Sequence, residues 1–193
     1  MKIGLFFGSF NPIHIGHLAI ANYMVEFANI DELWFVITPQ NPEKQKNTLL
    51  ADNQRYYMVQ LAIEFFPKMK ASTVEFSLPQ PSYTIHTLIH LHEKYPQHSF
   101  ALIMGSDNLQ TFHTWKNYRE ILEAYTLLVY NRPHTNIPEE FADHPSVQYI
   151  KAPLMEISSS FIRQSIKQGK NIRGFMPEAA WKYLDEMNFY KNS

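Results

Sequence analysis

Residues 8–17 read GSFNPIHIGH, and they join an apolar run to a stretch with helical spacing. The run, residues 3–7, is short enough to be a buried strand, whereas residues 18–28 (LAIANYMVEFA) repeat their apolar side chains at helical intervals. Glycine, serine and asparagine near the start of the quoted stretch are turn residues, and Pro12 prevents the strand from running on. The sequence therefore predicts a strand, a tight turn and a helix in succession.

Two histidines lie at the start of the predicted helix. His14 and His17 are three residues apart, so in the first helical turn they share a face. The N–H groups of a helix N-terminus, the helix dipole and two imidazoles together make a site suited to phosphates. Either histidine alone would more often cap the helix or lie half-buried with satisfied hydrogen bonds. The complete cluster after a first strand favours the anion site.

Gly16, between the two histidines, also needs a reason. A glycine destabilises a helix by about 1 kcal/mol relative to alanine. Close approach of a ligand to the backbone would explain its presence. We therefore expect a ligand to contact the chain at this position.

Strand and helix patterns alternate along the rest of the chain. Several strand patterns are apolar throughout, which is typical of a parallel sheet covered on both faces. The fold predicted is α/β: a doubly wound, Rossmann-like, mostly parallel sheet with helices on both faces and a helical C-terminal end. The predicted strands are 2–8, 33–38, 71–76, 99–104, 126–130 and 147–150, and the predicted helices are 15–28, 53–65, 83–95, 117–124, 159–168 and 177–187.

Ligands of such sheets bind outside the carboxyl ends of the strands, at the point where the strand order reverses. We therefore expect the chemistry in the segments that follow the predicted strands. These segments are 8–17, 39–47, 77–84, 105–116, 131–136 and 153–163. The polar stretch 131–146 is expected to be a surface excursion.

Composition limits the classes of function. The chain has 193 residues, a formal net charge of −1 and no cysteine. We expect one domain over residues 1–193, without a basic field for nucleic acid and without disulfides, thiolate zinc sites or cysteine nucleophiles. No apolar stretch reaches about 18 residues and no basic-plus-apolar leader opens the chain. We expect a cytoplasmic protein with no membrane partner.

The opening stretch resembles the GxFDPxHxGH motif of the nucleotidylyltransferase superfamily, whose members release pyrophosphate from nucleoside triphosphates. The letters HIGH, residues 14–17, also occur in class I aminoacyl-tRNA synthetases. Those enzymes need a second motif, KMSKS, and the nearest string here, KMKAS at 68–72, leads into the predicted third strand. The position of that string argues against a synthetase.

Four further segments resemble the bacterial nicotinate-nucleotide adenylyltransferases, in the family's order. PSYTIHTL at 81–88 is similar to SYTxDTL, and residues 103–122 resemble a GxDxxxxxxxWxxxxxL segment. NRP at 131–133 recurs after the fifth strand of the family, and residues 157–184 resemble ISSTxIRxxIxxGxxIRxxVPxxVxxYI. The resemblance implies adenylyl transfer from ATP to nicotinate mononucleotide, giving deamido-NAD and pyrophosphate. The alternatives are the same chemistry on nicotinamide mononucleotide or phosphopantetheine, or a nucleotide-binding module without catalysis.

Positive groups are expected near the triphosphate. Residues 157–163, ISSSFIR, place serines where a helix cap belongs and Arg163 a turn later, so this helix start could hold the β- and γ-phosphates. The resemblance implies that a lysine of the 39–50 loop also reaches the triphosphate. Spacing favours Lys46, and Lys44 remains the alternative.

The resemblance also implies a pyridine site. Trp115 would stack on the ring, and main-chain amides near Thr84 and Lys116 would hold the nicotinate carboxylate. A carboxylate such as Asp107, at the end of the fourth strand, suits ribose hydroxyls.

The chain departs from the family at two positions. Phe7 stands where many relatives have glycine, and Asn11 where most have aspartate. Asparagine can still make the hydrogen bonds of the turn, so we expect the activity to be kept.

Together these readings assign each group of residues a role. Catalysis is assigned to His14, His17, Lys46 and Arg163. ATP binding is assigned to Gly8, Ser9, Phe10, His14, His17, Gly105, Asp107, Arg132, Ser159, Ser160 and Arg163. Binding of the pyridine substrate is assigned to Tyr83, Thr84, Asp107, Trp115 and Lys116.

No general base is expected, because the attacking phosphate oxygen is largely ionised at pH 7, with a second pKa near about 6. We expect Mg²⁺ to arrive with ATP rather than on a protein metal site. His86 and His90 are four apart, but no third ligand is placed beside them. A homo-oligomer is left open.

Overall fold

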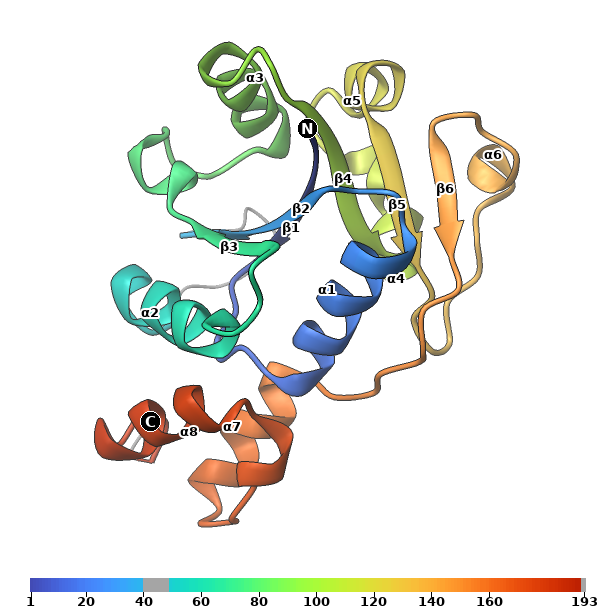
Figure 1. Cartoon of the computed structure of the whole chain (residues 1–193). Helices are drawn as coiled ribbons and strands as arrows, with labels where there is room; N and C mark the ends of the chain where they lie inside the picture. The colour runs from blue at the N-terminus through green and yellow to red at the C-terminus, as the bar shows by residue number, and fades with distance from the viewer. Residues whose placement is uncertain (40–48, 192–193) are drawn as a thin grey trace.

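The computed structural model describes residues 1–39 and 49–191. In this part of the chain six strands form one sheet in the order β3-β2-β1-β4-β5-β6, with every neighbouring pair parallel (Figure 1). The strand order reverses between β1 and β4, which makes the carboxyl ends of these two strands the switch point. The doubly wound fold is confirmed. The strands are β1 Lys2–Gly8, β2 Glu32–Ile37, β3 Met69–Ser72, β4 Ser99–Gly105, β5 Thr126–Tyr130 and β6 Val147–Ile150.

Helices cover both faces of the sheet, as predicted. Figure 1 shows α1, α2, α7 and α8 on one side and α3 and α5 on the other. The helices are α1 Ile15–Phe27, α2 Asp52–Ile63, α3 Thr84–Lys94, α4 Ser106–Gln110, α5 Tyr118–Ala124, α6 Glu139–Ala142, α7 Ser159–Lys167 and α8 Glu178–Glu186. Among the described residues, no helix has the length and apolar character needed to cross a membrane.

The side chains of each central strand contribute to two hydrophobic cores, one on each face of the sheet, which explains why these strands are apolar throughout. Successive side chains of a strand point to opposite faces of the sheet. Leu5 of β1 therefore packs in the core under α3 and α5, and its neighbour Phe6 packs in the core under α1, α2, α7 and α8. Both side chains are buried, so the strand has no polar face.

The predicted third strand, 71–76, is wrong in its second half. Strand β3 pairs with β2 from Met69 to Ser72, and residues Val74–Ser77 form a 3-10 helix instead. The Ser72 hydroxyl accepts a hydrogen bond from the Val74 N–H at this bend. The change of direction buries Glu75, whose carboxylate accepts a hydrogen bond from the Thr87 hydroxyl at 2.7 Å.

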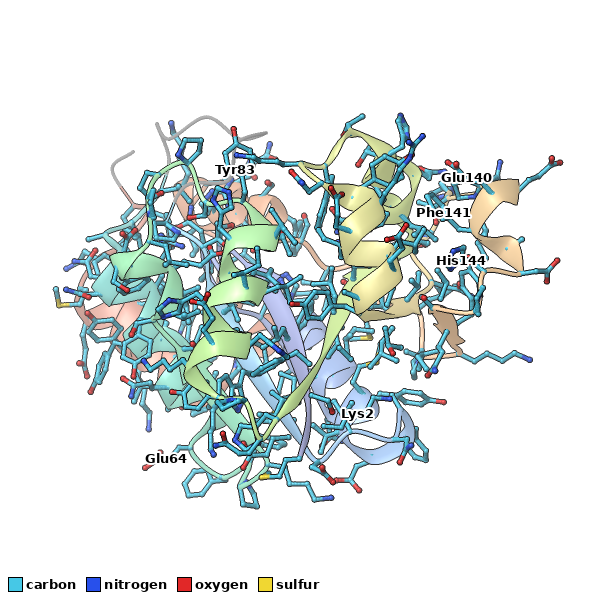
Figure 2. The ribbon with its side chains drawn as sticks, turned by 90° about the horizontal axis from the view of Figure 1, so that it is seen from above. Lys2, Glu64, Tyr83, Glu140, Phe141 and His144 are labelled. Atoms are coloured by element: carbon cyan, nitrogen blue, oxygen red, sulfur yellow. The ribbon has the colours of Figure 1, made fainter. Side chains whose placement is uncertain are left out.

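The stretch 131–146 is only partly a surface excursion. It contains the short helix α6, and Phe141 of this helix is buried against the ring of Phe112, with ring centroids 5.9 Å apart. In Figure 2 Phe141 lies toward the body of the molecule, whereas Glu140 lies at its outer edge. A single aromatic in a polar segment therefore attaches it to the core.

Candidate functional site

The buried ring of Phe10 packs on the inner side of the turn that follows β1. Phe10 has φ 43°, and its buried ring lies edge-on to those of Phe6, Phe35 and His17. A Cβ on Gly8 would come within 2.8 Å of this ring, so the turn requires glycine there. The Phe10 side chain is a core group, and any contact with ATP would have to come from its main chain.

The two histidines hold each other at the start of α1. The His17 N–H donates to His14 Nδ1 and the His14 N–H donates to His17 Nδ1, each at 3.3 Å. The rings stack with centroids 3.6 Å apart. Because both Nδ1 atoms accept, the neutral rings carry their hydrogen on Nε2. The reciprocal cap thus sets the tautomer of both imidazoles.

His14 is a neutral donor rather than a cation. Its side chain is buried, and this burial, together with the nearby charge of Arg132, lowers the pKa of His14 to about 3. The ring is therefore uncharged at neutral pH. It can offer a phosphate one hydrogen bond and no formal charge.

The reason for Gly16 differs from the one expected. A Cβ at this position would lie 3.0 Å from Nδ1 and 3.1 Å from Cε1 of His14. The group that approaches the backbone here is the His14 ring itself, and no ligand is needed to explain the glycine.

Replacing Gly16 by alanine is expected to lower turnover by about tenfold while changing stability little. The helix gains about 1 kcal/mol of propensity, but the His14 ring must shift by a few tenths of an ångström, and misplaced catalytic groups slow a reaction. Steady-state kinetics and thermal unfolding would measure both effects. Ala19→Gly, on the exposed side of α1, is the control: it should lose stability and keep its rate. Full activity of Gly16→Ala would contradict the prediction.

The start of α7 meets the turn before α1. Ser158, rather than Ser159, caps the helix by accepting from the Phe161 N–H at 3.2 Å. Ser159 Oγ donates to the Pro12 carbonyl at 2.9 Å. Arg163 Nη1 donates to the Asn11 carbonyl at 2.7 Å. The structure therefore brings the two predicted phosphate-binding helix starts together.

The ends of β4 and β5 carry a second charged pair. Arg132 Nε lies 3.7 Å from Asp107 Oδ1, and a Cβ on Gly105 would overlap the Asp107 carboxylate. The Arg132 N–H donates to the buried Ser106 hydroxyl at 2.8 Å, and this hydroxyl also lies 2.5 Å from Thr135 Oγ1. Sequence reasoning missed Ser106 because serine after a strand carries no distinctive pattern.

A cleft of about 230 Å³ opens beside this edge of the sheet. Sites that enclose a whole drug-sized ligand have volumes of about 300–1,000 Å³. This cleft is smaller, so it suits one part of a nucleotide. Four of the predicted substrate residues line it together, whereas Asp107 lies beside Arg132 instead. The lining residues are Phe7, Gly8, Ser9, Thr38, Glu75, Ser82, Tyr83, Thr84, Leu102, Ile103, Met104, Asn108, Thr114, Trp115 and Lys116.

The aromatic side of the cleft comes from Tyr83, before α3, and from Trp115, at the end of a 3-10 helix over Phe112–Thr114. Tyr83 precedes the first residue of α3 (Figure 2), and Lys116 Nζ lies 4.6 Å from the centre of its ring. Trp115 packs on the buried ring of Phe112 with centroids 5.4 Å apart. The indole is thus supported from behind.

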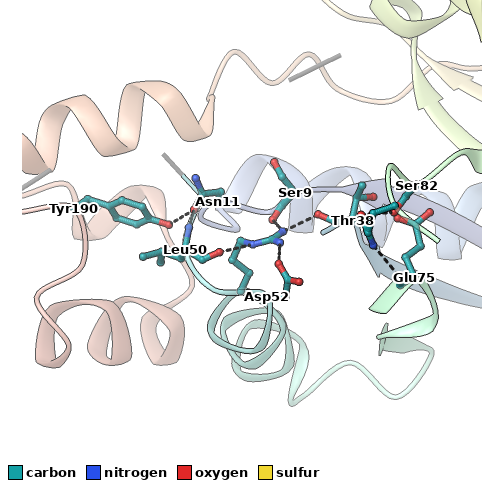
Figure 3. A network of polar contacts seen from close by, with 10 residues as sticks. Ser9, Asn11, Thr38, Leu50, Asp52, Glu75, Ser82 and Tyr190 are labelled. Carbon is teal, nitrogen blue, oxygen red and sulfur yellow. Dashed lines mark hydrogen bonds and ion pairs between the residues drawn. The ribbon is translucent and has the colours of Figure 1, made fainter. Parts of the chain in front are cut away.

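A polar network behind the turn was not predicted (Figure 3). Asn11 Oδ1 accepts from the Leu50 N–H at 3.2 Å and from the Tyr190 hydroxyl at 2.6 Å. Arg55 is fully buried and donates to the carbonyls of Ser9, Thr38 and Leu50. The amide oxygen at position 11 therefore links the turn to Leu50 and to Tyr190. An arginine in a helix would ordinarily be assigned to the solvent face.

The predicted triphosphate lysines, Lys44 and Lys46, lie outside the described residues. Within the described part of the chain, no group of three or more histidine, cysteine or carboxylate side chains is placed to hold a metal ion.

The chain is similar to known proteins over its whole length. The cytidylyltransferase-like family model matches residues 5–165. A relative from Flavobacterium johnsoniae, named "Probable nicotinate-nucleotide adenylyltransferase", is 58% identical and covers 99% of this chain and 100% of its own length. A relative of the same name from Flavobacterium psychrophilum is 55% identical with the same coverage.

Solved structures share the fold. The nicotinic acid mononucleotide adenylyltransferase of Plasmodium falciparum in complex with NaAD superposes with a TM-score of 0.85 at 22% identity, over 100% of this chain and 98% of that one. The same enzyme in complex with APC has a TM-score of 0.83 at 21% identity, with equal coverage. At these identities the likeness concerns the fold alone.

Proposed function

This chain belongs to the nicotinate-nucleotide adenylyltransferase family, and on that premise we propose that it transfers the adenylyl group of ATP to nicotinate mononucleotide. In this reaction a phosphate oxygen of the mononucleotide attacks the α-phosphorus of ATP, and the bond from that phosphorus to pyrophosphate breaks. The products are deamido-NAD and pyrophosphate. The observation that carries the proposal is the meeting of two helix starts, at His14 and Ser159, beside a cleft with an aromatic wall.

Positioning and charge neutralisation supply the catalysis in this proposal. The nucleophile is already largely ionised, since the second pKa of a phosphate monoester is near about 6. The Nε2–H groups of His14 and His17 donate to the α-phosphate as charge develops there. Arg163, Ser159 and Ser160 bind the leaving pyrophosphate, with Lys46 as the proposed further cation. ATP enters with Mg²⁺ on its phosphates.

The remaining assignments stay proposals of the same kind. Arg132 and Asp107 would bind the ATP side of the site, with main-chain groups of Gly8, Ser9, Phe10 and Gly105. Residues 1–193 would act as one domain in the cytoplasm, without nucleic-acid or membrane partners.

The pyridine ring binds in the cleft, where Trp115 stacks on it and the Thr84 and Lys116 main chains face its carboxylate. Trp115→Ala is expected to raise the KM for nicotinate mononucleotide by about 5- to 100-fold, because stacking of a base on an aromatic contributes about 1–3 kcal/mol. The KM for ATP should change little. Steady-state kinetics with each substrate varied in turn would measure the difference. Trp115→Phe is the matched control and should recover most of the affinity. An equal rise in both KM values would contradict the assignment of Trp115 to the pyridine.

Turnover of ATP with several acceptors side by side tests the function. Pyrophosphate release should depend on nicotinate mononucleotide and be slower with nicotinamide mononucleotide or phosphopantetheine. Faster release with either of the other acceptors would reassign the substrate. No release with any of them would favour a nucleotide-binding module.

A further inference from the structure

Glu75 is a carboxylic acid that the reaction described above does not use. Its residue is 1% exposed, yet it lines the cleft assigned to the pyridine ring. Oε1 accepts a hydrogen bond from Thr87 at 2.7 Å, whereas Oε2 has no hydrogen-bond partner among the described residues. Buried polar atoms are nearly always paired, so an orphaned one in a ligand cleft suggests that a ligand completes the set.

Within residues 1–39 and 49–191, no cation compensates this carboxyl group. The groups that act on it are the hydroxyls of Thr87 on α3, of Thr38, which follows β2, and of Ser82 before α3. Figure 3 shows Thr38 and Ser82 near Glu75. Burial is the largest influence, and it raises the pKa of Glu75 above its ordinary value of 4.5. Among the described residues lining the cleft, Lys116 is the other charged group, and its ammonium lies over the ring of Tyr83.

The two protonation states of Glu75 would treat the two pyridine substrates differently. A neutral carboxylic acid has an O–H donor, which suits the carboxylate of nicotinate. An ionised carboxylate has only acceptors and repels a second carboxylate, whereas it can accept a hydrogen bond from the amide of nicotinamide. A site built to donate to a substrate group discriminates strongly against a mismatched analogue.

We propose that Glu75 determines the specificity of the cleft: in its acid form it donates its Oε2 hydrogen to the carboxylate of the bound nicotinate ring. This inference rests on the proposed function. It names a residue that distinguishes the carboxylate of nicotinate from the amide of nicotinamide. Where Glu75 is ionised in the free protein, binding of nicotinate mononucleotide takes up one proton from solvent, which forms the Oε2–H bond. Binding of nicotinamide mononucleotide takes up none at this residue.

The sign of the pH dependence follows. Below the pKa of Glu75 the acid form is already present, and nicotinate mononucleotide binds without proton uptake. Above it, the apparent affinity for nicotinate mononucleotide falls by about tenfold per pH unit relative to nicotinamide mononucleotide. Both ligands carry the same phosphate, so its titration cancels in the comparison.

Calorimetric titration tests the proposal directly. Each mononucleotide is titrated into the full chain saturated with the α,β-methylene analogue of ATP, which blocks turnover. The titrations use buffers of different ionisation enthalpy between about pH 5 and 8.5. On binding, the wild type should take up as much as one proton more with the nicotinate ligand than with the nicotinamide ligand. In Glu75→Gln, which keeps an acceptor for Thr87 and a neutral donor, the difference should vanish and the affinity ratio should become independent of pH.

Glu64→Gln is the matched control, because Glu64 is an exposed carboxylate after α2 (Figure 2). It should behave like the wild type. Equal proton uptake for the two ligands at every pH of this range in the wild type would overturn the proposal, even if Glu75→Gln failed to fold. Unchanged proton uptake in Glu75→Gln would overturn it as well. A chain that turns over neither mononucleotide would instead refute the proposed function. If the chain turned over nicotinate mononucleotide but took up no extra proton on binding it at any pH of this range, only the role of Glu75 would be refuted.

Discussion

His17→Ala is expected to lower the rate of adenylyl transfer by about 10²–10³-fold, the usual effect of removing one preorganised donor to a developing charge. The proposed donor is Nε2–H, whose position follows from the hydrogen bond that His17 Nδ1 accepts from the His14 N–H. The fold should survive, since a lost helix cap destabilises a protein by about 0.5–2 kcal/mol. Pyrophosphate release and thermal unfolding would measure the two effects separately.

Two other replacements of His17 separate donation to phosphate from capping. The oxygen of asparagine can take the place of Nδ1, so His17→Asn should keep the cap on the His14 N–H and lose the donor. The amide nitrogen of glutamine can reach the place of Nε2, so His17→Gln should recover part of the rate and lose the cap. Near-normal turnover in His17→Ala, or full activity in His17→Asn, would show that the imidazole does not act on the phosphate.

Local patterns predicted the elements that build the site. Neighbouring residues in the sequence determine strand β1, helix α1 and helix α7. The signals are runs of apolar residues, turn residues and a serine cap. Tyr83 and Trp115 were assigned to one site through the family resemblance, because no local pattern connects positions that lie on separate loops. Their common cleft appears only once the parallel order brings the ends of β1 and β4 together.

The failures have long-range causes. The β-like run 71–76 leaves the sheet, and Glu75 is buried by a contact with Thr87 on the next helix. Gly16 is explained by where one imidazole packs, which the spacing of HxGH does not reveal. The fold and most of the candidate site could therefore be predicted from the sequence. The buried polar groups could not, because their partners are distant in the chain.

Arg55→Met should have the largest effect on stability. Arg55 is 0% exposed and donates to the carbonyls of Ser9 at 2.6 Å, Thr38 at 3.0 Å and Leu50 at 3.0 Å. Methionine fills similar space, but each buried acceptor left without a donor costs about 1–3 kcal/mol. We expect the free energy of unfolding to fall by about 3–5 kcal/mol, as it does when one partner of a buried charged network is removed. Urea unfolding would measure the loss.

Ser9 and Thr38 line the cleft on one side and are held by Arg55 from the other, so activity should fall together with stability. Arg55→Lys keeps the charge but cannot supply several acceptors in a planar fork, so it should give an intermediate loss. Asp52→Asn weakens only the ion pair of Arg55 with a side chain that is 44% exposed, and its loss should stay below about 1 kcal/mol. If Arg55→Met were within 1 kcal/mol of the wild type, these carbonyls would not depend on the guanidinium. The inference that Arg55 of α2 supports the turn after β1 would then have to be abandoned.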